Sequence, residues 1–287
     1  MSSSSTSSTP SAPRSPQSST TGSPQPSVRR AAVVTHGRDG VGEPLARLRA
    51  LAESAGVELS VDDETAPPPD VAIVLGGDGT MLRALARFLG TGVPVIGVNY
   101  GRVGFLTAIP GDRLEDGLGR VFAGEYRRIE LSTVEVQVGD VHRVAVNDVV
   151  VAGGELGRMV ELAYAIGHED LGVQPCDGVI CASPAGSTAY NLSNGGPVLV
   201  WGIDAMVLTF VAPHSLHIRP LVVPRGPEVV VENRTPDFDA TVLVDGHAVG
   251  WLATGAHATI RIAEQRSVLG TLPEVTFFRR YAATFGR

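Results

Sequence analysis

The stretch VAIVLGGDGT, residues 71–80, decides the fold class of this chain of 287 residues. Residues 71–75 are apolar without alternation, which is typical of a strand buried on both faces of a parallel sheet. Residues 76–79 predict a tight turn, and the apolar spacing over 80–89 predicts a short helix. A strand, a glycine loop and a helix in this order form the unit from which α/β domains are built.

The same alternation of strand and helix continues on both sides of this stretch. Residues 31–35 are a short apolar strand, 44–56 carry a helical pattern closed by a glycine, and 57–61 form another strand. A further buried strand is predicted at 93–98. We therefore expect an α/β domain with a mostly parallel sheet over residues 29–128.

Beyond residue 129 the apolar residues alternate with polar ones. Residues 134–138 and 141–146 form such strands around a Gly-Asp turn, and the pattern returns at 228–231, 241–244 and 259–262. This periodicity is typical of antiparallel sheets with one exposed face. We expect a β-rich, mainly antiparallel domain over residues 129–270.

The first 28 residues are almost wholly Ser, Thr, Pro, Gly and Gln, which predicts a disordered tail. A transit peptide is the alternative, because such peptides are also rich in Ser and poor in acidic residues. The two cysteines, Cys176 and Cys181, are too few for a disulfide framework and fit two small buried thiols in a reducing compartment. We expect a cytoplasmic protein.

The charged residues exclude several kinds of chemistry. All 23 basic residues are arginines, so lysine-dependent phosphate loops, the protein-kinase strand lysine and Schiff-base chemistry are excluded. A net charge of −7 without a basic stripe argues against nucleic acid as a partner. The most apolar stretch, 197–212, is short and contains Asp204, which argues against a membrane span.

The GGDGT loop at residues 76–80 predicts an anion site. Glycines let a ligand approach the main chain, and the N–H groups at the start of a helix attract a phosphate. Asp78 places a carboxylate beside that phosphate, which suits a site where a proton or a metal ion is handled. The alternative is a simple turn or capping role for Asp78.

Three further motifs are rich in polar residues or glycine and are candidates for ligand binding. The loop GVNYGRVGFL, residues 97–106, follows the next strand and lacks the G-x-G-x-x-G dinucleotide fingerprint. Asn147-Asp148 offers an amide and a carboxylate, which can read a base edge and accept hydrogen bonds from sugar hydroxyls. The run at 183–197 follows Asp177-Gly178, and its small residues allow a ligand to lie close to the chain.

These blocks together closely resemble the NAD kinases, which phosphorylate the adenosine ribose 2′-hydroxyl of NAD to give NADP. GGDGT at 76–80, GVNYGRVGFL at 97–106, Asn147-Asp148 and the 177–197 run with GSTAY match in order and spacing. The resemblance covers roughly residues 71–280. It implies that the dinucleotide lies between the two domains and that residues 271–287 return to the α/β domain.

The resemblance also implies roles for individual residues. Asp78 takes the position of the catalytic base, with Gly79 as a main-chain contact beside it. The residues expected to bind the dinucleotide are Asn147, Asp148, Arg158, Asp177, Thr188, Ala189, Tyr190, Ser193 and His247. The family further implies ATP or polyphosphate as donor, a divalent metal such as Mg²⁺, and a homodimer or homotetramer.

Some interpretations stay open on the sequence. The family most often has Glu at Asp148 and Thr at Ala185, which leaves the affinity for NAD and the choice between NAD and NADH undetermined. With no lysine, Arg83 or Arg102 is expected to meet the charge of the donor phosphate, although Arg83 also fits an exposed helix position. His214 and His217 lack a third ligand nearby, which favours structural roles over zinc. A lipid or small-alcohol kinase and a non-catalytic dinucleotide sensor are the alternative functions.

Overall fold

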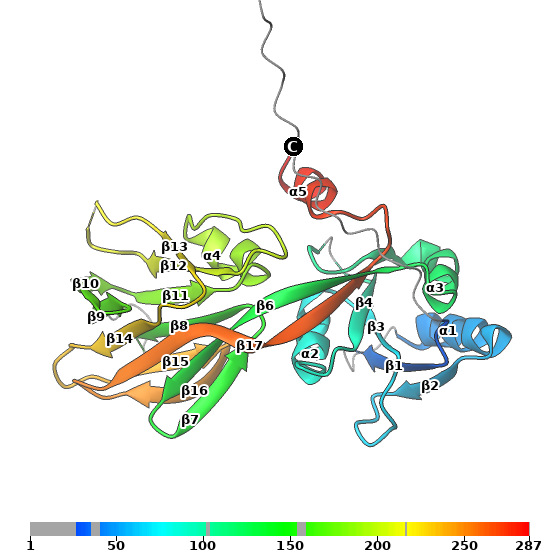
Figure 1. Ribbon diagram of the computed structural model, residues 1–287, viewed down its shortest axis with the longest axis horizontal. Coiled ribbons are helices and arrows are strands. Elements are labelled where there is room, and N and C mark those ends of the chain that lie inside the picture. Colours follow the sequence, from blue (N-terminus) through cyan, green and yellow to red (C-terminus); the bar gives the residue numbers. More distant parts are fainter. Residues whose placement is uncertain (1–26, 36–40, 102–103, 154–158, 216, 287) are drawn as a thin grey trace, which may run out of the picture.

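The computed structural model describes residues 27–35, 41–101, 104–153, 159–215 and 217–286. Figure 1 shows two halves side by side, one with helices around a sheet and one built from strands, joined by two long strands. The architecture confirms the predicted class, an α/β half with a mostly parallel sheet followed by a β-rich antiparallel half.

The N-terminal half is a sheet covered by helices on both faces. Its strands lie in the order β4-β3-β1-β2 and all of these neighbours pair in parallel. The elements are β1 (Arg30–Thr35), α1 (Gly42–Ala55), β2 (Glu58–Val61), β3 (Val71–Gly76), α2 (Asp78–Arg87), β4 (Pro94–Asn99), β5 (Ile109–Pro110) and α3 (Leu114–Phe122), with a 3₁₀ turn at Gly111–Arg113.

Alternate residues of the parallel strands point to opposite faces, and each face packs against helices. On one face, Ile73 and Leu75 of β3 lie in the same buried cluster as Leu48 of α1 and Leu118 of α3. Their neighbours Ala72 and Val74 lie in the cluster that contains Met81, Ala84 and Leu85 of α2. Because both faces are buried, the strand sequence is apolar throughout, as residues 71–75 predict.

The C-terminal half packs two antiparallel sheets face to face. One sheet has the order β13-β12-β11-β8-β15-β16, and the other continues from the N-terminal sheet through β17, β14, β9 and β10. Both cysteines are free and buried in the core between the sheets, and burial raises the pKa of each thiol to about 12. The strands are β6 (Arg127–Val138), β7 (Val141–Ala145), β8 (Asp148–Gly153), β9 (Val160–Ile166), β10 (Glu169–Cys176), β11 (Gly178–Ala182), β12 (Ala205–Val211), β13 (Leu221–Pro224), β14 (Val229–Asn233), β15 (Ala240–Val244), β16 (His247–Leu252) and β17 (His257–Thr271).

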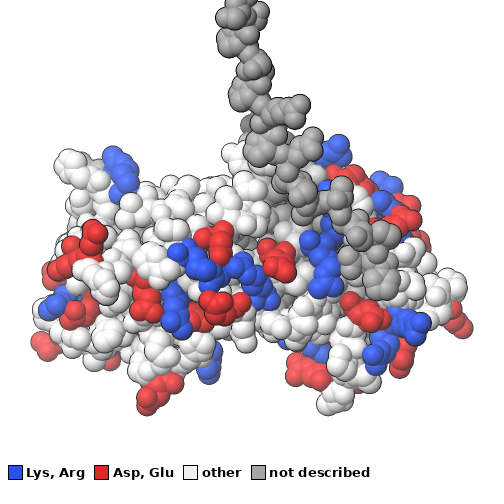
Figure 2. Space-filling model, viewed as in Figure 1, with Lys and Arg blue, Asp and Glu red and all other residues white. Residues whose placement is uncertain are grey.

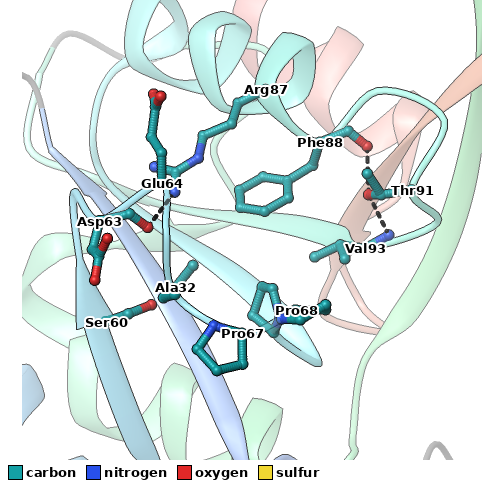
Figure 3. Close-up of a pocket in the computed structure, with 12 residues that line it drawn as sticks. Ala32, Ser60, Asp63, Glu64, Pro67, Pro68, Arg87, Phe88, Thr91 and Val93 are labelled. Carbon is teal, nitrogen blue, oxygen red and sulfur yellow. Dashed lines mark hydrogen bonds between the residues drawn. The ribbon is translucent and has the colours of Figure 1, made fainter.

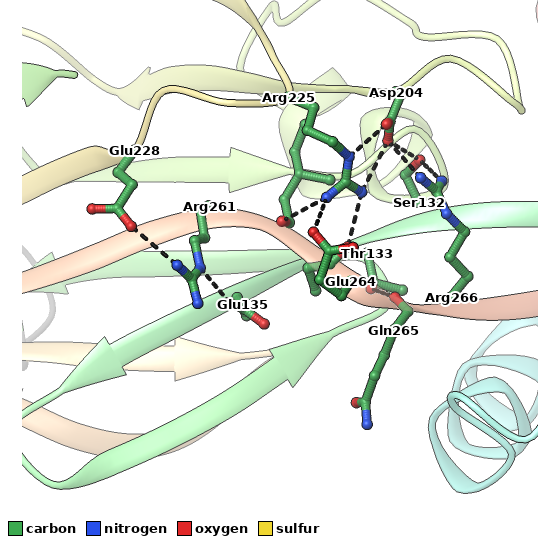
Figure 4. Close-up of polar contacts among 12 residues, drawn as sticks. Ser132, Thr133, Glu135, Asp204, Arg225, Glu228, Arg261, Glu264, Gln265 and Arg266 are labelled. Atoms are coloured by element: carbon green, nitrogen blue, oxygen red, sulfur yellow. Dashed lines mark hydrogen bonds and ion pairs between the residues drawn. The ribbon is translucent and has the colours of Figure 1, made fainter.

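Two long strands join the halves. β6 and β17 pair antiparallel along their length, and the far end of β17 pairs in parallel with β4. Their register shifts between Ile262 and Arg266, and a charged network around Asp204 surrounds the shift (Figure 4). The domain boundaries at 128 and 270 remain predictions, since β6 and β17 run through them without a break.

Several elements differ in their bounds from the sequence prediction. Helix α2 begins at Asp78, so Gly76 ends the strand and Gly77 caps the helix in place of a four-residue turn. The expected strand over 141–146 ends at Ala145, and a separate strand starts at Asp148. A short helix, α4 (Tyr190–Ser193), and a C-terminal helix, α5 (Phe277–Phe285), complete the chain. No helix in the described part of the chain has the length and hydropathy of a membrane span.

Candidate active site

Asp78 lies in the first turn of α2, at the carboxyl end of β3. Gly77 precedes it in extended conformation. The carbonyl of Gly77 accepts hydrogen bonds from the N–H groups of Thr80 and Met81, both at 3.0 Å. Because the first N–H groups of a helix lack partners within the helix, this end carries a partial positive charge that favours an anion. The loop therefore has the polarity expected of a phosphate site.

The Asp78 carboxylate is held by the second glycine-rich loop. Its Oδ2 accepts the N–H of Phe105 at 2.6 Å, and its Oδ1 accepts the N–H of Leu106 at 3.0 Å. Gly104 lies so close that a Cβ at this position would overlap the carboxylate, which explains why glycine occupies it. The two loops, which follow neighbouring strands, thus meet at Asp78.

A pocket of about 560 Å³ opens in front of the start of α2. It is lined by Gly76, Gly77, Gly79, Thr80, Arg83, Tyr100 and Gly101. Arg83 is exposed, and its guanidinium donates to the carbonyl of Thr35 at 3.1 Å while lining the pocket. A wall of main-chain atoms with one arginine suits a phosphate group better than an apolar ligand.

Asn147 and Asp148 form a second group, organised by Asp245. The Asp245 carboxylate accepts the N–H groups of Val146, Asn147 and Asp148 at 2.9, 2.7 and 3.2 Å. These bonds pair three main-chain N–H groups at the link between β7 and β8. Asp245 itself has a positive φ of 48°, in the turn between β15 and β16.

The two carboxylates of this group share a buried position. Asp148 is 6% exposed, and burial together with the charge of Asp245 raises the pKa of Asp148 to about 7. Burial also raises the pKa of Asp245, against the opposing effect of its three N–H donors. Near neutral pH the pair therefore holds a proton in part of the molecules.

The segment that follows β11 packs against Asn147. Ser183 donates its hydroxyl to the carbonyl of Val146 at 2.5 Å, and a Cβ at Gly186 would overlap the carbonyl of Asn147. Thr188 bonds the carbonyl of Ala185, and Tyr190 is 46% exposed at the start of α4. Ala189 caps α4 and Ser193 ends it, so four of the expected binding residues lie on one short segment.

One apolar cluster joins the two groups. Phe105 and Leu106, which hold Asp78, pack in the same cluster as Val146 and Ala185 from the second half. Three buried polar atoms without a hydrogen-bond partner were found in the described residues, namely Asn147 Oδ1, Trp201 Nε1 and Arg280 Nε. Unpaired buried polar atoms are costly, so their presence around this cluster indicates a surface that a polar ligand or water completes.

Comparisons with known proteins agree with this geometry. A model of the ATP-NAD kinase N-terminal domain matches residues 25–126, and one of the C-terminal domain matches residues 146–268. The chain is 38% identical over 244 residues to the NAD kinase of Heliobacterium modesticaldum, covering 83% of this chain and 85% of that protein. The chain belongs to the ATP-NAD kinase family.

Other relatives are consistent with this membership. The NAD kinase of Ralstonia nicotianae is 41% identical over 208 residues, which cover 71% of this chain and 68% of that protein. A crystal structure of an NAD kinase from Archaeoglobus fulgidus in complex with ATP aligns with a TM-score of 0.72 at 28% identity, over 90% of this chain and 97% of that chain. Yeast NADH kinase in complex with NADH has a TM-score of 0.79 at 21% identity, over 91% of this chain and 89% of that chain, and shares the fold. The chain is thus an NAD kinase, and the match to the C-terminal model favours this function over the lipid-kinase alternative.

Not every residue expected at the NAD kinase site lies beside Asn147. Asp177 precedes β11, next to Gly153, whereas Asp148 pairs with Ala182 at the other end of that strand. Five residues of strand separate these positions by about 16 Å.

His247 is exposed and its Nδ1 lies 3.1 Å from the carbonyl of Asp245. Arg158 and Arg102 lie outside the described residues.

Two residues near the candidate active site were not singled out from the sequence. Asp245 is recognisable only as part of an Asp-Gly turn, and Arg280 only as one of two arginines after Phe278. Both contact residues about 100 or more positions away, which local patterns do not reveal. The described residues contain no cluster of three or more His, Cys, Asp or Glu that could hold a metal.

A second hollow of about 530 Å³ lies at the other end of α2. Phe88, Pro67, Pro68 and Val93 form its apolar part, and Arg87 donates to the carbonyl of Asp63 at 2.6 Å on its rim (Figure 3). Helix α2 has ten residues, so about 15 Å of helix separates this hollow from Asp78. It is distinct from the candidate active site at the start of α2.

Proposed function

We propose that Asp78 is the general base of the NAD kinase reaction. The ribose 2′-oxygen of NAD attacks the terminal phosphorus of ATP, the bond from that phosphorus to the bridging oxygen breaks, and ADP leaves. The 2′-hydroxyl proton passes to Asp78. The observation that carries this proposal is the orientation of the carboxylate by two main-chain N–H groups, beside a pocket that suits phosphate.

The pocket at the start of α2 is proposed to hold the phosphates of the donor. Helix N–H groups, with Gly79 as the main-chain contact beside Asp78, supply the positive potential. Arg83 supplies a full positive charge at the rim, which takes on the role that a lysine has in other kinases. Polyphosphate presents the same chemistry as the ATP tail, so the pocket accommodates either donor in this proposal.

The dinucleotide is proposed to lie along the second group of residues. Asn147 has a buried carboxamide oxygen without a partner, which can accept from a base amino group, and Asp148 can accept from sugar hydroxyls. Tyr190 presents an exposed ring for stacking. The other proposed dinucleotide contacts are Arg158, Asp177, Thr188, Ala189, Ser193 and His247.

A Mg²⁺ ion fits this donor set in the way usual for kinases. Mg²⁺ is commonly held by one or two carboxylates together with substrate phosphates and water. Asp78 is the carboxylate that the 76–83 segment offers. When bound, the ion neutralises charge on the phosphates, whereas the chain's own groups position the hydroxyl and take up its proton.

We also propose that the enzyme is a cytoplasmic homodimer or homotetramer. Apolar side chains are exposed on strands at the sheet edges, with Val173 of β10 53% exposed, Val222 of β13 51% and Trp251 of β16 67%. Exposed apolar residues on edge strands favour association with another chain. Light scattering coupled to size exclusion measures the mass directly, and a monomer at micromolar concentration contradicts the proposal.

The variant Asp78→Asn tests the proposed base. Such a base contributes about 10²- to 10⁴-fold in rate, so we expect kcat to fall by that factor while the Kd for NAD changes little. NADP formation from NAD and NADPH formation from NADH are measured with ATP or polyphosphate as donor, with Mg²⁺ or with EDTA. The exposed Asp112→Asn serves as the matched control. An unchanged kcat in Asp78→Asn removes Asp78 from this role.

A further inference from the structure

Helix α5 packs directly on the loop that holds Asp78. The ring centroid of Phe277 lies 5.3 Å from that of Phe105 and 5.3 Å from that of Trp201. Phe285 stacks on Phe105 at 6.0 Å. The C-terminal helix therefore bridges the GGDGT half and the segment after α4, over the junction of the two halves (Figure 1).

Arg280 brings a largely buried positive charge to this contact. Its Nη1 donates to the carbonyl of Phe105 at 2.8 Å, and its guanidinium carbon lies 5.9 Å from the ring centroid of Trp201. Burial lowers the pKa of Arg280 to about 10, and the charge of Asp78 opposes that shift. The guanidinium is thus charged at neutral pH and interacts electrostatically with the Asp78 carboxylate.

Phe105 connects the two charged groups through its main chain. Its N–H donates to Asp78 Oδ2 at 2.6 Å, and its carbonyl accepts from Arg280. We propose that Arg280 is a positioning residue for Asp78, which it orients by fixing the main chain at Phe105. This inference rests on the proposed role of Asp78 as the base.

The physical effect of Arg280 on Asp78 is orientation. The main chain at Phe105 can tilt about its neighbouring bonds, and Gly104 before it places little steric restriction on that motion. The bond from Arg280 fixes the Phe105 carbonyl, so the adjacent N–H keeps its direction toward Asp78. Loss of the donor leaves a buried carbonyl unpaired and frees the loop, and a misplacement of about 1 Å at a reacting group costs on the order of 100-fold in rate.

The variant Arg280→Met tests this inference, because methionine keeps apolar contact with Trp201 and removes the donor and the charge. We expect kcat to fall about 10- to 100-fold, with the KM values for NAD and ATP within about threefold. Arg280→Lys keeps a charged donor and is expected to recover most of that loss. The neighbouring Arg279 is exposed, so Arg279→Met serves as the control and is expected to retain the wild-type kcat. A wild-type kcat in Arg280→Met overturns the inference.

A double-mutant cycle separates positioning from a general structural effect. If Arg280 acts through Asp78, adding Arg280→Met to Asp78→Asn lowers the residual kcat by less than about twofold. Equal factors in both backgrounds mean that Arg280 acts independently, which overturns the inference. Circular dichroism and Tm check folding, and Arg280→Leu, which also lacks a donor, takes the place of Arg280→Met if the latter does not fold.

The same variants distinguish this inference from the proposed function. If Asp78→Asn keeps the wild-type kcat, the proposed base is wrong and the inference fails with it. If Asp78→Asn is impaired while Arg280→Met is fully active, the base stands and Arg280 alone loses its role.

Discussion

The negative charge of Asp148 destabilises the folded state. It is buried beside Asp245, and both carboxyl groups have a raised pKa for that reason. The folded state retains a proton on Asp148 up to about pH 7, whereas the unfolded chain releases it near pH 3.9. Because the folded state binds more protons in this interval, the free energy of unfolding falls as the pH rises from about 4 to 7.

The variant Asp148→Asn is expected to remove this pH dependence. Asparagine is neutral at all pH values, so the unfavourable burial of a charge is absent above pH 7. Each pKa unit corresponds to about 1.4 kcal/mol, and we expect the variant to be at least about 1 kcal/mol more stable than the wild type at pH 8. Urea unfolding at pH 5 and pH 8 measures the difference.

The exposed Asp140→Asn, in the turn between β6 and β7, is the control and is expected to leave the pH dependence intact. A variant Asp148→Asn that is no more stable than the wild type at pH 8 contradicts the buried-proton explanation.

At the scale of residues, the sequence identified the groups with distinctive local chemistry. Asp78 stands in a glycine loop and Asn147-Asp148 forms a polar pair, so both could be named as candidates from pattern alone. Asp245 and Arg280 could not, because their partners lie 98 and 175 positions away in the sequence. Their contacts follow from tertiary packing, which no local pattern encodes.

At the scale of elements, β17 departs from a regular strand at the register shift. Asp204 accepts bonds from Arg225 at 2.6 Å, Arg266 at 3.1 Å and Ser132 at 2.9 Å (Figure 4). Arg225 also donates to the carbonyl of Ala263 within the shift. Side chains thus pair main-chain groups that the ladder leaves free, which stabilises the bend between the two halves.

The variant Asp204→Asn is expected to destabilise the protein by about 1–2 kcal/mol, a modest value because the side chain is 38% exposed and partly screened. The bond from Arg225 lowers the pKa of Asp204 to about 2. Its contribution is therefore present above about pH 4 and is lost as the pH falls toward 2. Urea unfolding at pH 7 measures the effect.

Glu264, the other acidic partner of Arg225, is 94% exposed, so Glu264→Gln is expected to change stability by less than about 0.5 kcal/mol. Equal losses in the two variants would show that Asp204 has no special place in the network.

The elements themselves were predictable to different degrees. Buried parallel strands such as β3 have a continuous apolar signature, and the prediction was correct there. Helix α2 begins two residues before the predicted start, because Asp78 and Gly79 have low intrinsic helix propensity, whereas an acidic residue in the first turn is favoured by the helix dipole. The end of β7 was predicted to within one residue, whereas β8 was not predicted as a separate strand.

At the scale of the whole molecule, the two halves share two long strands and an apolar cluster. β6 and β17 pair through both halves, and one apolar cluster contains α2, Phe105, Val146 and Trp201. The face in Figure 2 carries acidic and basic side chains interleaved, without a continuous basic area. Cohesion between the halves thus comes from shared strands and a shared core.

This continuity predicts that the halves unfold together. Trp251 lies on the edge strand β16 and is 67% exposed in the single chain. Trp251→Phe keeps an aromatic ring at this position, so we expect it to change stability by less than about 0.5 kcal/mol, and it leaves Trp201, at the junction, as the sole tryptophan. In urea, Trp201 fluorescence and far-ultraviolet circular dichroism are expected to give the same midpoint, as a single cooperative transition requires. Both midpoints should shift together with protein concentration if the chain is an oligomer. A fluorescence transition that precedes the loss of strand signal would mean that the junction opens first, and that β6 and β17 do not couple the halves.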